Sequence, residues 1–137
     1  MQKNKRLSEW MPWSRKDNFN GKNNPGVYVL AKFSGKLPSG PADPSISNVI
    51  YIGETCNQSL ARRWYQFGRS AFESRGGHSG GWTYLELFGD SGHDLYVAAL
   101  AITKEEPYLS ADIRLIEREF LSKYVYANNE YPNCNRK

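Results

Sequence analysis

One carboxylate stands on a helical face that should be apolar. In the segment IRLIEREFLSKY, residues 113–124, a rotation of about 100° per residue places Glu117 among the apolar side chains. These are Leu109, Ile113, Ile116, Phe120 and Tyr124. An unpaired carboxylate is costly to bury. Glu117 therefore requires a partner such as Arg63 or a tyrosine hydroxyl, a bound proton, or a metal ion.

One arginine and two tyrosines could supply the rest of a phosphate-handling site. Arg63 lies at the border of the apolar face of its own predicted helix, so its guanidinium can reach a phosphate while its stem lies on the core. A surface salt bridge is the alternative. Tyr28 and Tyr51 lie on neighbouring predicted strands and can converge on one side of a sheet. A phenol is a poor base unless a cation stabilises the phenolate, and from the residues alone both tyrosines are core side chains.

Runs of β-branched and aromatic residues at 26–33 and 49–53 predict the two strands that carry the tyrosines. A third strand is predicted at 95–102. Prolines and glycines in residues 34–48 predict a long loop between the first two strands. Four glycines in residues 74–82 predict a mobile loop.

Helices are predicted at 60–72 and across 113–124, because apolar residues recur there every three or four positions. Ser59 is the expected N-cap of the first helix. The expected fold is therefore α/β (α+β): a small, mainly antiparallel, three-stranded central sheet flanked by helices.

Charge divides the 137-residue chain into two parts. Residues 1–24 carry the whole net charge of +4, and residues 25–137 are balanced and of a size that suits one domain. A basic N-terminal arm with Trp10 and Trp13 suits a polyanion such as nucleic acid. A solvated, frayed terminus is the alternative.

The composition also bears on location and metal class. No apolar run approaches the roughly 18 to 20 residues that cross a bilayer, and the N-terminus lacks the apolar stretch of a signal peptide. We therefore expect a soluble, cytoplasmic protein without a membrane partner. Cys56 and Cys134 form no CxxC pair, so we expect free thiols rather than a zinc site.

Five short motifs occur in order along the predicted elements. GVY at 26–28 and YIG at 51–53 are on strands, LARRW contains Arg63, EREFLSKY begins at Glu117, and PNCN follows near the C-terminus. Together, over residues 26–135, they resemble the GIY-YIG nuclease superfamily. The long loop between the GVY and YIG strands is similar to that of restriction-enzyme-like members.

The resemblance implies a metal-dependent endonuclease that hydrolyses phosphodiester bonds of DNA, either duplex or branched. By similarity, Glu117 binds one divalent cation, Mg²⁺ or Mn²⁺, which would explain a carboxylate on a packing face because hard cations take oxygen ligands. Arg63 would contact the phosphate. Tyr28 would deprotonate or orient the attacking water, and Tyr51 would have a positioning role.

Two further residues receive roles through the same resemblance. Asn135, in PNCN, would orient the glutamate helix or a catalytic group through its amide, with a solvated tail residue as the alternative. Phe67 stands where several relatives have histidine. His78 is the candidate to replace it, either as a general base or as an ordinary loop residue. His93, in the turn GDSGHD, is expected to be structural.

Two other functions fit parts of the sequence. A non-catalytic nucleic-acid-binding module would keep the scaffold and the basic arm, but it has no reason to keep a carboxylate on a packing face. A small α/β domain for protein contacts is favoured only if the motif matches are coincidental. For the nuclease, one active site cuts one strand, so a double-strand break requires a homodimer, sequential nicking or a partner.

Overall fold

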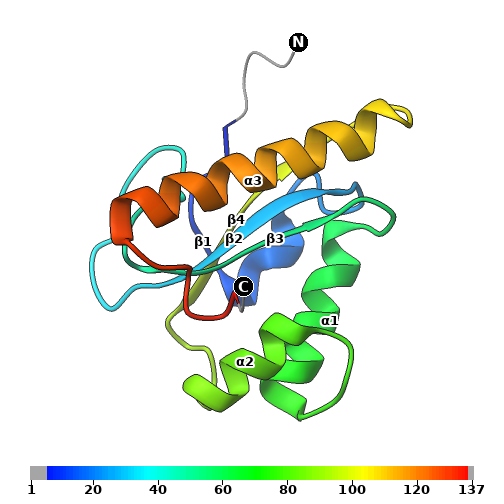
Figure 1. Cartoon of the computed structure of the whole chain (residues 1–137). Coiled ribbons are helices and arrows are strands. Elements are labelled where there is room, and N and C mark those ends of the chain that lie inside the picture. The colour runs from blue at the N-terminus through cyan, green and yellow to red at the C-terminus, as the bar shows by residue number, and fades with distance from the viewer. Residues whose placement is uncertain (1–5, 136–137) are drawn as a thin grey trace.

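A four-stranded antiparallel sheet forms the centre of the computed structural model, which describes residues 6–135 (Figure 1). The strands lie in the order β1-β4-β2-β3 and comprise β1 (Met11–Pro12), β2 (Gly26–Lys32), β3 (Val49–Thr55) and β4 (Leu95–Ala101). The helices are η1 (Trp13–Asn18, a 3-10 helix), α1 (Leu60–Glu73), α2 (Ser79–Leu87) and α3 (Tyr108–Asn128). The predicted mixed α/β class is confirmed.

The sheet has one strand more than the three predicted. The additional strand is β1, whose residues Met11 and Pro12 pair with Val97 and Tyr96 on the outer edge of β4. Two residues are too few for an alternating pattern, so only the pairing partner identifies this strand. β3 also continues two residues beyond Gly53, because Glu54 and Thr55 still pair with β2.

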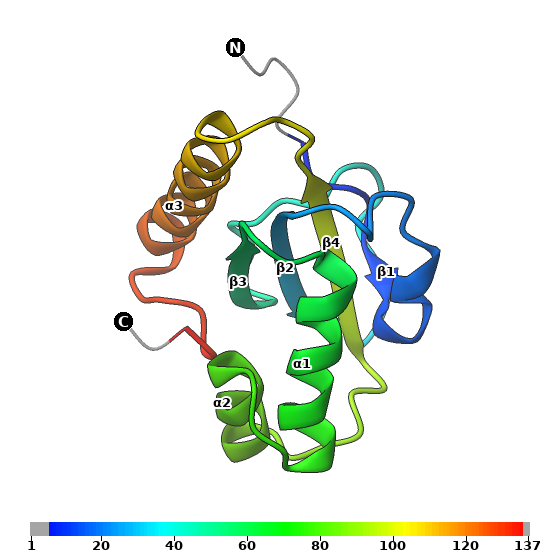
Figure 2. The same cartoon turned by 90° about the vertical axis from the view of Figure 1, so that its right-hand side faces the viewer.

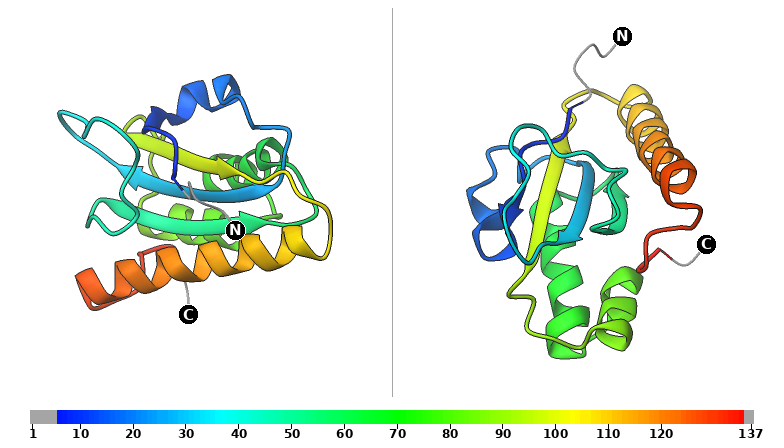
Figure 3. Two further views of the ribbon diagram at one scale, coloured as in Figure 1. Left: turned by 90° about the horizontal axis from the view of Figure 1, so that it is seen from above. Right: turned by 90° about the vertical axis from the view of Figure 1, so that its left-hand side faces the viewer.

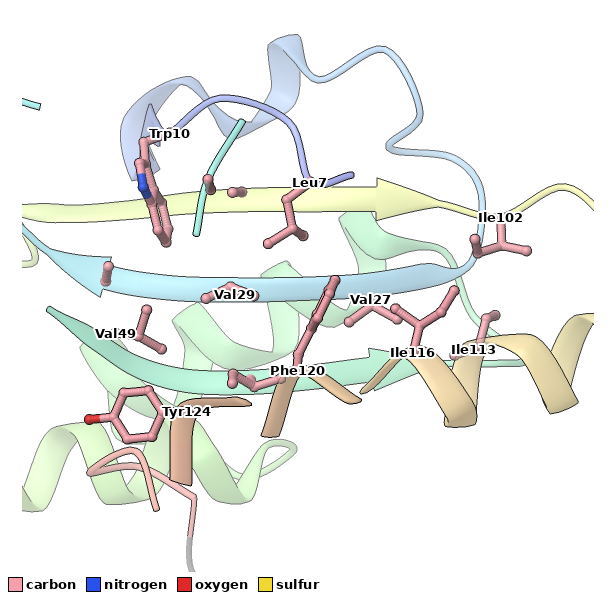
Figure 4. Close-up of a cluster of buried hydrophobic side chains, with 14 of the residues drawn as sticks. Leu7, Trp10, Val27, Val29, Val49, Ile102, Ile113, Ile116, Phe120 and Tyr124 are labelled. Carbon is pink, nitrogen blue, oxygen red and sulfur yellow. The ribbon is translucent and has the colours of Figure 1, made fainter. Parts of the chain in front are cut away.

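Alternation along β2 directs side chains into two separate cores. Val27, Val29 and Ala31 face α3, whereas Tyr28 and Leu30 face α1. In the α3 core, Ile113, Ile116, Phe120 and Tyr124 are buried as predicted (Figure 4). The sheet separates α3 from α1 and α2 (Figure 2). Because β2 is packed on both faces, every side chain from Val27 to Ala31 is fully buried.

The helix α3 runs alongside β3, the strand at the open edge of the sheet (Figure 3). Side chains at the border of its buried face therefore lie near the edge of β3. On the other side, α1 packs through Trp64 and Phe67, both fully buried. Ser59 caps α1 as predicted, since its hydroxyl accepts from the Arg62 backbone N–H at 3.1 Å.

The N-terminal segment is packed from its first described residues. Leu7 and Trp10 are buried in the α3 core, and the Ser8 backbone N–H donates to the Ala99 carbonyl at 2.9 Å. Phe19 contacts Trp64 of α1 at a ring distance of 6.0 Å. Over residues 6–24, the basic arm thus lies on the sheet and on α1 rather than fraying. Its charges at positions 3 and 5 lie outside the described residues.

The mobile loop predicted at 74–82 is only partly a loop, because α2 begins at Ser79 and includes residues 79–82. His78 is its N-cap, with Nδ1 accepting from the Gly81 backbone N–H at 3.2 Å. Gly81 allows close approach to α1: a Cβ there would lie 2.6 Å from the Phe67 carbonyl oxygen. Tyr84 then anchors the helix in the α1 core. The glycines therefore provide close packing, which their count alone does not reveal.

The helices and the two cysteines of residues 6–135 bear on the expectations drawn from composition. None of the helices in that range is both long enough and apolar enough to cross a membrane. Cys56 and Cys134 are free thiols, as predicted.

Candidate active site

A shallow hollow of about 430 Å³ opens at the β3 edge of the sheet. We name it the Tyr51 hollow. The strand β3, the helices α2 and α3 and the C-terminal segment each contribute to its wall. Its lining residues are Tyr51, Ile52, Gly53, Glu54, Ser79, Thr83, Glu117, Cys134 and Asn135. Three of the six predicted site residues, Tyr51, Glu117 and Asn135, thus share one concave surface.

Tyr51 lies in a slot between two glycines. A Cβ on Gly53 would lie 2.5 Å from Tyr51 Cε2, and a Cβ on Gly80 would lie 2.6 Å from Tyr51 Cε1. Both distances are far below van der Waals contact. Gly53 is the glycine of the YIG motif, so its place in the sequence follows from the need to accommodate this ring.

Tyr28 lies beneath Tyr51 on the same side of the sheet. It pairs with Gly53 across the β2–β3 ladder, and the two tyrosine rings are 5.9 Å apart. Tyr28 is fully buried, whereas Tyr51 is partly exposed and lines the hollow. The family resemblance gave water activation to Tyr28. Of the two tyrosines, Tyr51 lines the hollow and Tyr28 does not.

A chain of hydrogen bonds runs from α2 to the two tyrosines. The Gly81 N–H donates to His78 Nδ1, so the neutral imidazole carries its proton on Nε2. His78 Nε2 then donates to the Tyr28 hydroxyl at 2.8 Å. Tyr28 lies next to Tyr51, and hydrogen bonding to Tyr28 lowers the pKa of Tyr51. His78 therefore lies behind the tyrosines, and it does not line the hollow.

Burial dominates the titration of this chain of groups. It raises the pKa of Tyr51 to about 12, with Arg63 lowering that pKa and Glu117 raising it. It raises the pKa of Tyr28 well above its ordinary value, and the neighbouring Tyr51 adds to that rise. Burial, followed by the charge of Arg63, lowers the pKa of His78 to about 3. All three groups are therefore uncharged near neutral pH.

Glu117 lies at the border of the buried face of α3. It is partly buried and lines the Tyr51 hollow, and its charge acts on Tyr51. Glu54, from the opposite side of the hollow wall, is a second carboxylate on the same surface. Within residues 6–135, no three His, Cys, Asp or Glu side chains form a metal cage. Mg²⁺ commonly uses one or two carboxylates together with waters and substrate phosphates, so this donor set fits it.

Arg63 lines a second hollow, which adjoins the Tyr51 hollow at Glu54. Its Nη1 donates to Gln66 Oε1 at 2.6 Å and to the Gly77 carbonyl at 3.4 Å. Gln66 is held in turn by Gln58. The charge of Arg63 acts on both site tyrosines and on His78. The arginine is thus fixed beside the tyrosines and not within the Glu117 wall itself.

Asn135 closes the outer edge of β3. Its Oδ1 accepts from the Ile52 N–H, and its Nδ2 donates to the Ile52 carbonyl, both at 2.9 Å. The Cys134 N–H donates to the Ile50 carbonyl at 2.7 Å. The side chain therefore replaces a neighbouring strand and fixes the backbone between Tyr51 and Gly53.

Sequence reasoning missed two contributors to the hollow. Gly80 was assigned to a mobile loop, although it holds the Tyr51 ring. Glu54 follows the YIG motif directly, but no sequence pattern marks it as a wall residue. The alternation of β3 does not reveal Glu54 as a wall residue, because that depends on the position of α3. The turn-rich letters GGHSGG give no signal that would identify Gly80.

The chain was compared with protein-family models, with curated proteins and with solved structures. No family model, no curated protein and no solved structure matches it.

Proposed function

We propose that this protein is a metal-dependent endonuclease that hydrolyses phosphodiester bonds of DNA, as its resemblance to the GIY-YIG superfamily implies. The observation that carries the proposal is the convergence on one hollow of residues distant in the sequence. Tyr51, Glu117 and Asn135 line it, and Tyr28 and His78 support it from below. A domain that only contacts other proteins has no need of polar side chains gathered in this way around one hollow.

In this proposal, Tyr51 orients the attacking water, and its phenolate form, which a nearby cation would favour, accepts the proton that the water loses. Tyr51 lines the hollow, and hydrogen bonding to Tyr28 favours its ionised form. His78 keeps the Tyr28 hydroxyl directed toward Tyr51 by donating to it. The roles of the two tyrosines are thus exchanged relative to the family expectation.

Glu117 would hold the divalent cation, with Glu54 on the same wall. Such a cation supplies positive charge to the phosphoryl oxygens and offsets the negative charge that raises the pKa of Tyr51. Asn135 fixes the β3 backbone that carries Tyr51. Arg63 supplies a fixed positive charge at the border of the hollow for the phosphate backbone of the bound strand.

Supercoiled plasmid gives the direct test. The parent should nick it only with Mg²⁺ or Mn²⁺. Glu117→Gln, which removes the charge but keeps the shape, should lower the rate by at least roughly 100-fold. Glu119→Gln is the matched control, because Glu119 is exposed on the same helix.

The outcomes separate the candidate functions. DNA binding without nicking in either metal favours the non-catalytic module and refutes the proposed activity. Equal nicking by Glu117→Gln and the parent refutes the site assignment. A double-strand break made in one binding event would require a second active site. Gel analysis of the linear product at increasing protein concentration detects such breaks.

A further inference from the structure

The second hollow, which we name the Arg63 hollow, has a volume of about 450 Å³. It lies between the end of β3, the turn that leads into α1 and the first turns of α3. Two arginines line it: Arg63 from α1 and Arg114 from α3. Glu54 belongs to the walls of both hollows, so the two form one continuous depression.

Neither arginine of this hollow forms an ion pair with a carboxylate within residues 6–135. Arg63 donates to an amide oxygen and a backbone carbonyl, both uncharged. Arg114 takes part in no ion pair in the described part of the chain, and its charge acts on Glu106 and on the Cys56 thiol.

Two carboxylates, Glu54 and Glu106, line the same hollow. The two oxygens of Glu106 accept from the Ser110 backbone N–H at 2.9 Å and from the Ser110 hydroxyl at 2.5 Å. In the described residues neither carboxylate lies within ion-pair distance of Arg63 or Arg114, so guanidinium N–H groups of both arginines can donate to a bound anion.

The spacing along α3 places Arg114 in line with the catalytic glutamate. Ser110, Arg114 and Glu117 follow one another at intervals of four and three residues, so they share one stripe of the helix. Arg114 and Glu117 are separated by about 4.5 Å along the helix axis. A nucleic-acid strand that places one phosphate at Glu117 therefore brings a neighbouring phosphate to the Arg63 hollow.

We propose that Arg63 and Arg114 form a subsite for the backbone phosphate that flanks the scissile one, on the Glu54 side of the Tyr51 hollow. This inference rests on the proposed function, because it takes the ligand to be the same DNA strand. It fixes the path of that strand: along α3, from the Arg63 hollow at the start of the helix to the Tyr51 hollow at its middle.

Salt dependence of DNA binding tests the subsite without requiring cleavage. A fluorescein-labelled duplex is titrated by anisotropy, without divalent metal, over a salt series. Arg114→Ala should weaken binding roughly tenfold at low salt and reduce the slope of log K against log salt by about 0.9. Lys123→Ala is the matched control. It removes one charge from the same helix, but Lys123 lines a different hollow.

A thiol in the hollow provides an independent footprint. Cys56 lines it and is partly exposed, whereas Cys134 is buried, so the alkylation rate reports on Cys56. Saturating duplex should slow alkylation of Cys56 at least roughly fivefold, by steric cover of the hollow. In Arg114→Ala the same saturating duplex should protect Cys56 less. Protection is compared within each variant, because Arg114 itself lowers the pKa of the Cys56 thiol.

The outcomes distinguish this subsite from the nuclease activity. An altered slope and Cys56 protection support the subsite even if no plasmid is nicked. Nicking by the parent, with equal slopes for Arg114→Ala and Lys123→Ala or an unprotected Cys56, overturns the subsite alone. Absence of DNA binding by the parent overturns both.

Discussion

A single buried histidine should make the fold less stable as the pH falls from 7.5 to 5. His78 is only 3% exposed, and its pKa in the folded protein is about 3. In the unfolded chain it is solvated, with a pKa of about 6.5. Below pH 6.5 the unfolded chain therefore binds a proton that the folded chain does not bind, and the free energy of unfolding decreases with falling pH.

The size of this effect follows from the two pKa values. One proton changes the free energy of unfolding by about 1.4 kcal/mol per pH unit. Between pH 7.5 and 5 the loss is therefore about 2 kcal/mol, and it continues toward pH 3. This is a substantial part of the roughly 5 to 15 kcal/mol that stabilises a small domain.

Protonation of Asp90 also lowers the free energy of unfolding, but in a separate and more acidic pH range. Burial opposes its ionisation, but hydrogen bonds from Lys32 and Tyr84 prevail and lower its pKa to about 2. Its stabilisation is present above the unfolded pKa and is lost only as the pH falls below about 4.

Urea denaturation at several pH values between 7.5 and 5 measures the effect. The chain has two histidines, and His93 is exposed in a turn, so His93→Gln is the matched control. The parent and His93→Gln should lose stability together, whereas His78→Gln should be nearly independent of pH in this range. A parent that is equally stable at both ends of the range would refute the reasoning, as would an unchanged loss in His78→Gln.

Four further substitutions test how the site is built. Gly80→Ala should destabilise the fold by roughly 1 to 3 kcal/mol, because its Cβ would meet the Tyr51 ring at 2.6 Å; Gly76→Ala, with open space around it, should be near neutral in the same thermal unfolding assay. Tyr51→Phe should slow plasmid nicking by roughly 100-fold or more, and Tyr28→Phe should slow it less, since Tyr28 acts through Tyr51; the reverse order would restore the water-activating role to Tyr28. Asn135→Ala should cost roughly 1 to 3 kcal/mol of stability through two lost hydrogen bonds, whereas the exposed Asn133→Ala should be silent.

The sequence by itself determined the long elements of this fold. Three strands and two long helices lie close to their predicted positions, because uninterrupted β-branched runs and three-to-four periodicity report which residues a local structure can bury. The same periodicity singled out Glu117 as a carboxylate beside a packing face, and the structure places it at the border of that face.

Only the tertiary structure decided how the candidate site is arranged. The local sequence pattern does not show that Gly80 belongs to a helix. The glycines at the start of α2 are needed because the Tyr51 ring and the backbone of α1 pack closely against them, and both are distant in the sequence. Nor does the local pattern show that Tyr51 rather than Tyr28 meets the hollow, or that Arg63 lines the neighbouring one. Periodicity reports that a side chain faces inward, whereas its neighbours there are set by how α2, α3 and the C-terminal segment pack around the edge of β3.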